Sequence, residues 1–291
     1  MYSNIAQNKR KTWLLLAGFV LVTGAIGYFV GHLQNSTGLS IGILIGSFIY
    51  AVVMYYASSK VALSMSGAKQ IQRSDNPRLW NTVENLSITA GLPMPDVYIV
   101  NDPAPNAFAT GRNPEQASVA ATTGLLNQLD DAELEGVMAH ELSHVGNYDI
   151  RVSMIALALV AAIGFISDIF LRMMWFGGDS DRRNVHPALM LVGIVMVVLA
   201  PIIAALIRTA ISRQREYLAD ASGVMLTRYP EGLANALRKI SSYNRPVKKA
   251  SSSTAHLYFS NPLTGKISQL FSTHPPAADR IRRLLDAGNQ L

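Results

Sequence analysis

The segment LDDAELEGVMAHELSHVGNYD, residues 129–149, is the part of the chain around which the rest is arranged. Its apolar residues recur at helical spacing. Asp130 can cap a helix, and Glu133, three positions later, completes the pattern of a capping box. The segment is therefore predicted to be an α-helix. Residues four apart lie on one face of a helix, so His140 and His144 should point the same way.

The sequence His-Glu-Leu-Ser-His at residues 140–144 is typical of a zinc hydrolase. From one helix face, His140 and His144 can offer two imidazole nitrogens to a tetrahedral metal ion. Glu141 lies beside them and can act as a general base. Two histidines that bind no metal are the simpler alternative, and a third ligand elsewhere in the chain would argue against it.

The composition indicates a membrane protein whose metal is held without sulfur. The 291 residues include no cysteine, so disulfides and thiolate zinc sites are excluded and the ligands must be histidine and carboxylate. Hydrophobic residues make up 49% of the chain and charged residues 15%, and the mean hydropathy is +0.22. A soluble enzyme is more polar. The net charge of +6 comes mostly from residues that flank apolar runs, so we expect a lipid bilayer and no nucleic acid as partner.

Four apolar runs are long enough, or nearly so, to cross a bilayer as helices. Residues 12–30 and 39–57 form a first hairpin, with no acidic or basic residue in either run. Residues 152–167 and 188–207 form a second pair, of which the first run is the shorter. The basic residues 9–11 resemble the start of a signal peptide, but no clear cleavage site follows, so the first run is expected to remain as an anchor.

The distribution of basic residues predicts the orientation. Lys and Arg flank the first hairpin on both outer sides, whereas its turn, residues 31–38, has none. The N-terminus and the metal site are therefore predicted to be cytoplasmic. Arg182 and Arg183, between the runs of the second pair, weaken the charge asymmetry there.

The soluble part is predicted to begin with a helix that Asn76 caps and Gly91 ends. Residues 96–100 and 118–123 are predicted strands of a small sheet beside the metal-binding helix. An edge strand of such a sheet could bind an extended peptide by strand addition, and a sheet that only packs against helices is the alternative. Residues 246–260, rich in serine, are predicted to form a surface loop.

Two further segments can complete the site. In the polar helix predicted after residue 208, Glu216 and Asp220 lie four apart on one face, and both can point at the two histidines; a solvated acidic pair is the alternative. If the second apolar pair crosses the bilayer and returns, this helix emerges on the same side as the histidines. His274, ahead of a short C-terminal helix, is another candidate for the site.

Four motifs give the chain a resemblance to a known family: HELSH at residues 140–144, REYLAD at 215–220, NAFATG at 106–111 and STHPPAADRI at 272–281. In this order they resemble the motifs of membrane-embedded zinc metalloproteases of the HtpX heat-shock type, relatives of the CAAX prenyl proteases. The resemblance extends over nearly the whole chain.

The resemblance implies an endopeptidase of the bacterial inner membrane, with one zinc ion per subunit held by His140, His144 and Glu216. It implies that Asp220 orients a ligand histidine and pairs with Arg280. The implied substrates are misfolded or damaged membrane proteins, and homo-oligomerisation is left open.

The resemblance also implies roles for residues around the metal. Glu141 would activate a water, and His274 would stabilise the tetrahedral intermediate. The residues implied to face the substrate are Asn106, Ala107, Phe108 and Ala109.

The predicted fold is that of a mainly α membrane protein, with four transmembrane helices and a cytoplasmic α+β zincin-like protease domain of the gluzincin type that contains a small sheet. Residues 1–60 form the first transmembrane hairpin and residues 151–208 the second. Residues 61–150 and 209–291 form the two parts of the protease domain.

Three other functions fit parts of the sequence. An intramembrane protease would hold its zinc within the bilayer, but acidic residues at 130, 131, 133 and 135 put too much charge beside the motif for that depth. A prenyl-protein processing enzyme needs an enclosed membrane chamber, for which four spans offer little material. A membrane chaperone or adaptor that keeps zinc only for folding would not need Glu141, which is present.

Overall fold

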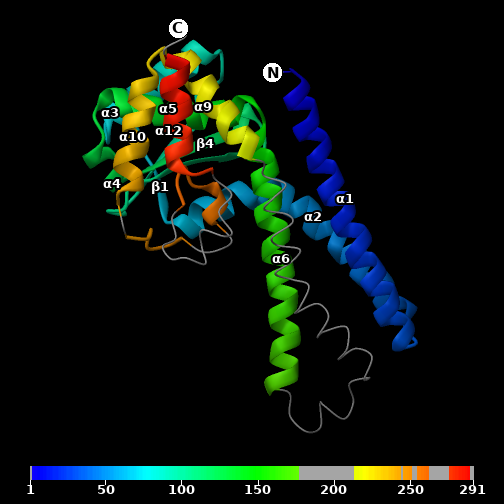
Figure 1. The fold of residues 1–291 in the computed structure, drawn as a ribbon. Helices are drawn as coiled ribbons and strands as arrows, with labels where there is room; N and C mark the ends of the chain where they lie inside the picture. The colour runs from blue at the N-terminus through cyan, green and yellow to red at the C-terminus, as the bar shows by residue number, and fades with distance from the viewer. Residues whose placement is uncertain (1, 177–212, 244, 251–253, 262–274, 289–291) are drawn as a thin grey trace. The chain divides into compact units, whose positions relative to one another are not determined.

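The structure, a computed structural model, describes residues 2–176, 213–243, 245–250, 254–261 and 275–288 (Figure 1). The chain divides into two compact units. The globular unit comprises residues 1–9, 58–154 and 211–291. The apolar unit comprises residues 10–57 and 155–210.

Two long helices, α1 (Tyr2–Leu33) and α2 (Thr37–Ser66), contribute most of the described apolar unit. A short turn joins them, in which Asn35 takes the left-handed conformation with φ 48°. The helices contact each other through aromatic side chains, and Trp13 stacks on Tyr55 with ring centroids 5.9 Å apart. Stacked rings of this kind hold two helices together where no water competes for their contacts.

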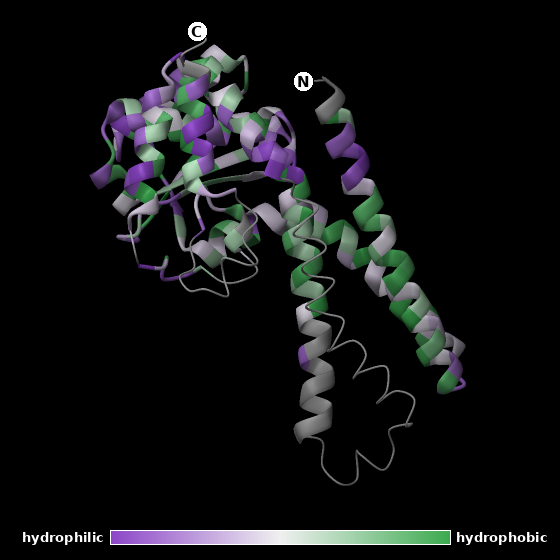
Figure 2. Ribbon diagram, in the orientation of Figure 1, coloured by the Kyte–Doolittle hydropathy of each residue, from purple (hydrophilic) through white to green (hydrophobic). Residues whose placement is uncertain are grey.

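The surfaces of both helices suit a lipid environment. Ile5–Leu33 and Thr37–Ser66 are long and apolar enough to cross a membrane, with mean hydropathies of 2.1 and 2.0. Leu21 is 72% exposed and Phe48 59% exposed, which in water would be unfavourable for such large apolar side chains. Figure 2 colours both helices as hydrophobic over much of their length. The prediction of two apolar helices near the N-terminus is confirmed.

The second predicted pair of spans is only partly described. Residues 152–167 belong to the long helix α6 (Asp149–Phe176). Within the described residues, a third spanning candidate exists only if α5 (Asp131–Gly146) and the first part of α6 count as one bent span. Residues 188–207, predicted as the fourth span, lie outside the described residues. The number of four spans therefore stays a prediction.

The globular unit contains a mixed four-stranded sheet in the order β1-β2-β4-β3. Its strands are β1 (Ala68–Gln70), β2 (Asp96–Val100), β3 (Ala107–Gly111) and β4 (Ala117–Thr122). β2 and β4 are parallel, whereas β3 runs antiparallel to β4 in the register that pairs Ala109 with Val119. β3 is therefore an edge strand. The sequence predicted β2 and β4 but neither β1 nor β3 as strands.

Helix α5 is the central element of the globular unit, because it contacts β3 and β4 as well as the neighbouring helices. Asp130 and Glu133 form the predicted capping box at its start. The helices that surround it are α3 (Pro77–Ala90), α9 (Arg213–Thr227) and α10 (Pro230–Ser241), and α12 (Ala277–Gly288) packs on α9 and α10 (Figure 1). The caps predicted for α3 are also found, with Asn76 accepting from Leu79 N and Gly91 left-handed at φ 64°.

Two glycines allow helices to approach α5 closely. A Cβ added at Gly136 of α5 would lie 2.8 Å from the backbone nitrogen of Leu233 in α10. A Cβ added at Gly223 of α9 would lie 3.1 Å from the backbone nitrogen of His140. These approaches bring α9, which carries Glu216, against the histidine-bearing part of α5.

The prediction of a surface loop at residues 246–260 is wrong for its last part. Thr254, Leu257, Tyr258 and Phe259 are buried. The side chains of residues 257–259 fill space beside α5 and β3. The serine-rich composition of the preceding residues indicated a surface loop and did not predict this buried segment. A short 3-10 turn, η2 (Ala255–Leu257), leads into this segment.

Candidate metal centre

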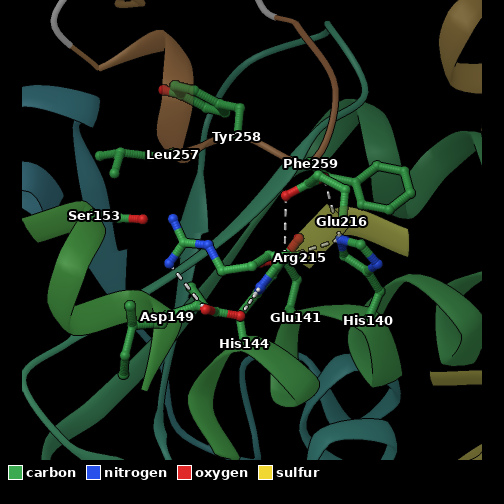
Figure 3. Close-up of a pocket in the computed structure, with 12 residues that line it drawn as sticks. His140, Glu141, His144, Asp149, Ser153, Arg215, Glu216, Leu257, Tyr258 and Phe259 are labelled. Carbon is green, nitrogen blue, oxygen red and sulfur yellow. Dashed lines mark hydrogen bonds and ion pairs between the residues drawn. The ribbon is translucent and has the colours of Figure 1, made fainter. Parts of the chain in front are cut away.

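The side chains of His140, His144 and Glu216 converge in the globular unit (Figure 3). Their ligand atoms all lie within 4.8 Å of one another. The Nε2 atoms of the two histidines are 3.1 Å apart. One carboxylate oxygen of Glu216 lies 3.5 Å from Nε2 of His144, and the other lies 3.8 Å from Nε2 of His140.

Each histidine directs its other ring nitrogen at a carboxylate. Nδ1 of His140 is 2.9 Å from Oδ1 of Asp220, and Nδ1 of His144 is 3.0 Å from Oδ2 of Asp149. These contacts place the proton of a neutral imidazole on Nδ1 and leave a lone pair on Nε2. The two lone pairs then face each other and a carboxylate, an arrangement of acceptors that a cation satisfies.

The spacing of these atoms fits zinc. Two nitrogens bound to one tetrahedral zinc ion, each at about 2.05 Å, lie about 3.3 Å apart. The separation of 3.1 Å between the Nε2 atoms is close to that value. Two histidines and one carboxylate also form a ligand set that leaves the fourth tetrahedral position open, as in catalytic zinc sites.

Asp220 is held by Arg280 of α12 through two parallel hydrogen bonds. Nε donates to Oδ2 at 2.8 Å and Nη2 donates to Oδ1 at 2.6 Å. Burial acts to raise the pKa of Asp220, but the charge of Arg280 and the hydrogen bond to His140 outweigh it and lower the pKa to about 2. Asp220 therefore stays ionised and can hold His140 in a fixed orientation. The structure thus brings together Asp220 and Arg280, the two residues that the family resemblance pairs.

Asp149, at the start of α6, holds the second histidine and was not predicted from the sequence. Arg215 donates from Nη1 to its Oδ1 at 3.0 Å, while its Oδ2 contacts His144. The predicted segment ended at this residue, but only the corner between α5 and α6 turns it back towards the site. Tyr148 makes that corner with a left-handed φ of 61°, which sequence patterns do not reveal for a tyrosine.

The two histidines differ in their proton affinity. Burial lowers the pKa of His140 to about 4, although Asp220 acts to raise it. Burial also acts to lower the pKa of His144, but the hydrogen bond to Asp149 and the charges of Glu216 and Asp149 outweigh it and raise the pKa to about 9. A metal ion that binds here therefore competes with a proton on His144, as is common for metal ligands.

Glu141 lies beside the ligands and is 2% exposed. Burial raises its pKa to about 7, and the charge of Glu216 acts in the same direction, while His144 and a hydrogen bond from the backbone of Ala109 act to lower it. A carboxyl group with a pKa near neutrality can both take up and return a proton at physiological pH.

The three ligand residues and Glu141 line a small cavity together with Leu257, Tyr258 and Phe259 (Figure 3). The cavity has a volume of about 30 Å³. This space accommodates a water molecule but no peptide.

The outer edge of β3 is paired with the same buried segment. The backbone N–H of Phe259 donates to the carbonyl of Ala107 at 2.8 Å, and Phe108 and Tyr258 form an antiparallel bridge. Their rings also meet edge to face, with centroids 5.2 Å apart. A peptide that adds to this edge as a strand therefore has to displace residues 257–259.

The other residues implied to contact substrate differ in burial and in their partners. Asn106 is 2% exposed, and its side chain donates to the carbonyl of Ser260 at 2.8 Å and accepts from Ser260 N at 3.1 Å. Ala109 lines the cavity. His274 lies outside the described residues.

Comparisons with known proteins point to one family. The sequence profile described as "Peptidase family M48" matches residues 73–287. The chain is 55% identical over 292 residues to "Protease HtpX homolog" of Tropheryma whipplei strain Twist, with 100% of this chain and 99% of that protein covered. It is 46% identical over 293 residues to "Protease HtpX homolog" of Ligilactobacillus salivarius, with 98% and 99% covered.

A solved structure has a similar fold. The crystal structure of S. mikatae Ste24p matches with a TM-score of 0.50 and 18% sequence identity, over 98% of this chain and 67% of that one. At this identity, the likeness concerns the fold alone.

The pair between Asp220 and Arg280 can be tested by Arg280→Met. The substitution leaves a buried carboxylate without its counter-ion, so we expect the free energy of unfolding to fall by about 3–5 kcal/mol. Because the pKa of Asp220 is lowered from 3.8 to about 2, the stability that it contributes is present above about pH 4 and is lost as the pH falls towards 2. Thermal and denaturant unfolding of the full chain in detergent at neutral pH measures the change.

Arg282→Met on the same helix is the matched control. Its side chain is 69% exposed and pairs with Asp279, so the expected change is below about 1 kcal/mol. Equal losses in the two variants would contradict a specific role for the buried pair.

Proposed function

Since the chain belongs to peptidase family M48, it is a membrane-bound metalloprotease, and we propose that it is a zinc-dependent endopeptidase that cleaves misfolded or damaged membrane proteins. The observation that carries this proposal is the convergence of two imidazole Nε2 atoms and a carboxylate at tetrahedral spacing. One zinc ion per chain, held by His140, His144 and Glu216, fits these three groups.

Each histidine ligand is held by its own carboxylate. Asp220 and Asp149 fix the rings of His140 and His144, so that both Nε2 atoms face the metal position. Zinc, when bound there, supplies Lewis acidity, which makes water more acidic and polarises a carbonyl group. The remaining chemistry consists of proton transfers by residues of the chain.

Glu141 is the proposed general base and acid. It takes a proton from the attacking water and returns it to the nitrogen of the leaving amine, so that the carboxyl group ends the cycle as it began. Its raised pKa of about 7 suits both transfers. The low exposure of its side chain also keeps bulk water from supplying the proton instead.

Substrate binding is proposed to use the edge of β3. An extended peptide there would take over the backbone contacts that residues 257–259 make with Ala107 and Phe108. Asn106 would then position the peptide from the start of the strand, beside Ala109. His274 is proposed to stabilise the charge that develops on the carbonyl oxygen. Recognition through backbone atoms places little demand on substrate sequence, as clearance of damaged proteins requires.

The proposed topology has four spans, with the protease parts at residues 61–150 and 209–291 in the cytoplasm and the two hairpins at 1–60 and 151–208. Basic residues flank the first hairpin, and its turn has none, which supports a cytoplasmic N-terminus in a bacterial inner membrane.

Glu141→Gln tests the proton transfers. The amide keeps the shape of the side chain but neither takes up nor returns a proton, so casein cleavage should fall roughly 100- to 10,000-fold while the protein keeps one zinc per chain. Elemental analysis and a casein digestion assay on the full chain in detergent measure both quantities. Glu135→Gln, at an exposed position of the same helix, should cleave at the wild-type rate. Wild-type cleavage by the Glu141 variant would remove Glu141 from the mechanism.

Glu216→Ala tests the third ligand. With one of three protein ligands removed, the purified variant should contain much less than one zinc per chain and should not cleave casein. Glu231→Ala, an exposed acidic residue in the first turn of α10, should retain full zinc content. A full zinc content in the Glu216 variant would exclude this residue from the ligand set.

The topology can be tested by single cysteines, because the chain has none of its own. In intact cells whose outer membrane has been made permeable, a membrane-impermeant maleimide should label Gln34→Cys in the hairpin turn. It should label Ser74→Cys, beyond the hairpin, only after the inner membrane is opened. The reverse pattern would contradict the proposed orientation.

A further inference from the structure

Asn8, in the segment ahead of the first apolar run, contacts the supports of the metal centre. It is 2% exposed. Its Nδ2 donates to Oδ1 of Asp149 at 2.8 Å and to the carbonyl of Asn147 at 2.8 Å. Arg215 donates to the same Oδ1 of Asp149 at 3.0 Å. Asn8 and Arg215 therefore hold one oxygen of this carboxylate, while the other oxygen holds His144.

Lys9, next to Asn8, also contacts the corner between α5 and α6. Lys9 places its Nζ 4.5 Å from the ring centroid of Tyr148, and Arg151 lies 4.9 Å from the same ring. Such cation–π contacts are favourable by about 0.5–1 kcal/mol at exposed sites. Tyr148 needs such support, because its left-handed backbone is unfavourable for a bulky residue. Asn8 and Lys9 thus contact three consecutive residues, 147–149.

The direction of the carboxylate matters for the metal. A ligand histidine is held in one tautomer and one orientation by the group that accepts from its second nitrogen. For His144 that group is Asp149, the first residue of α6, directly after the corner at residues 147 and 148. Without the two donated bonds of Asn8, the carbonyl of Asn147 loses a buried partner, and Arg215 is left as the donor to Oδ1 of Asp149, so the carboxylate is held less firmly towards His144.

We propose that Asn8 is a positioning residue of the metal centre, which fixes Asp149 and through it His144. This inference rests on the proposed function, because it assigns the segment before the first apolar run to the zinc site. Asn8 lies in the first part of α1, whose later residues form the first apolar run, so the anchor and this contact with the metal centre belong to one helix. Asn8 is not one of the residues that line the cavity beside the metal ligands.

The test compares zinc affinity in full-length Asn8→Ala, Asn8→Asp and wild-type protein in detergent, measured by competition with a chelator. Loss of a supporting contact should weaken zinc binding about tenfold in Asn8→Ala. Asn8→Asp keeps the size of the side chain but sets a carboxylate against Asp149, so its loss should be at least as large. The KM for casein should stay within about twofold of the wild-type value, because no substrate contact changes.

A double-mutant cycle with Asp149→Asn separates positioning from general stability. If Asn8 acts through Asp149, adding Asn8→Ala to Asp149→Asn should weaken zinc binding by no more than about twofold further. Gln7→Ala, an exposed neighbour in the same segment, is the matched control and should bind zinc as the wild type does.

Several outcomes would overturn the inference. A folded Asn8→Ala variant with wild-type zinc affinity would do so. A double variant whose loss of zinc affinity equals the product of the two single losses would do so as well. Failure of both Asn8 variants to fold would show a structural role instead. Wild-type protein that binds no zinc would contradict the proposed function itself, whereas zinc-binding wild type with an unaffected Asn8→Ala variant would contradict this inference alone.

Discussion

The metal centre is shaped by one electrostatic fact: three groups that carry lone pairs face one another, and a cation, either a proton on His144 or a metal ion, has to lie between them. The Nε2 atoms of His140 and His144 are only 3.1 Å apart, and the carboxylate of Glu216 lies beside both. Groups of this kind repel one another in a site from which water is largely excluded, unless a cation binds them. Asp220 and Asp149 contact the Nδ1 atoms of the two rings, where they favour the proton of a neutral imidazole. The lone pairs on the Nε2 atoms therefore point towards each other and towards Glu216.

The fold supplies the rigidity that such a site needs. α5 lies between the sheet and a layer of helices, and close approach at Gly223 sets the distance between α5 and the helix that carries Glu216. Arg280 reaches the site from α12 and ties the end of the chain to Asp220. Segments that precede and follow residues 155–210 in the sequence thereby belong to one globular unit. The apolar helices α1 and α2 have surfaces that suit lipid.

The sequence was informative where local rules operate. The capping residues of α3 and α5 and the apolar pattern of the first two long helices depend on neighbours along the chain, and the four-residue spacing of the histidines defines one face of α5. Patterns could not reveal contacts that depend on packing. Asp149 reaches His144 because Tyr148 adopts a left-handed conformation, and Asn8 reaches Asp149 across 141 positions. Buried residues 257–259 likewise follow a polar stretch that predicts a surface loop.

One zinc ion is expected to bind between two imidazoles of α5 and a carboxylate of α9. Anomalous X-ray scattering on crystals of the zinc-loaded full chain, recorded above and below the zinc absorption edge, tests it most directly. We expect a single zinc peak within bonding distance, about 2.0–2.2 Å, of His140 Nε2, His144 Nε2 and a carboxylate oxygen of Glu216. A zinc peak bound by other residues, or three unliganded side chains in zinc-loaded protein, would contradict it.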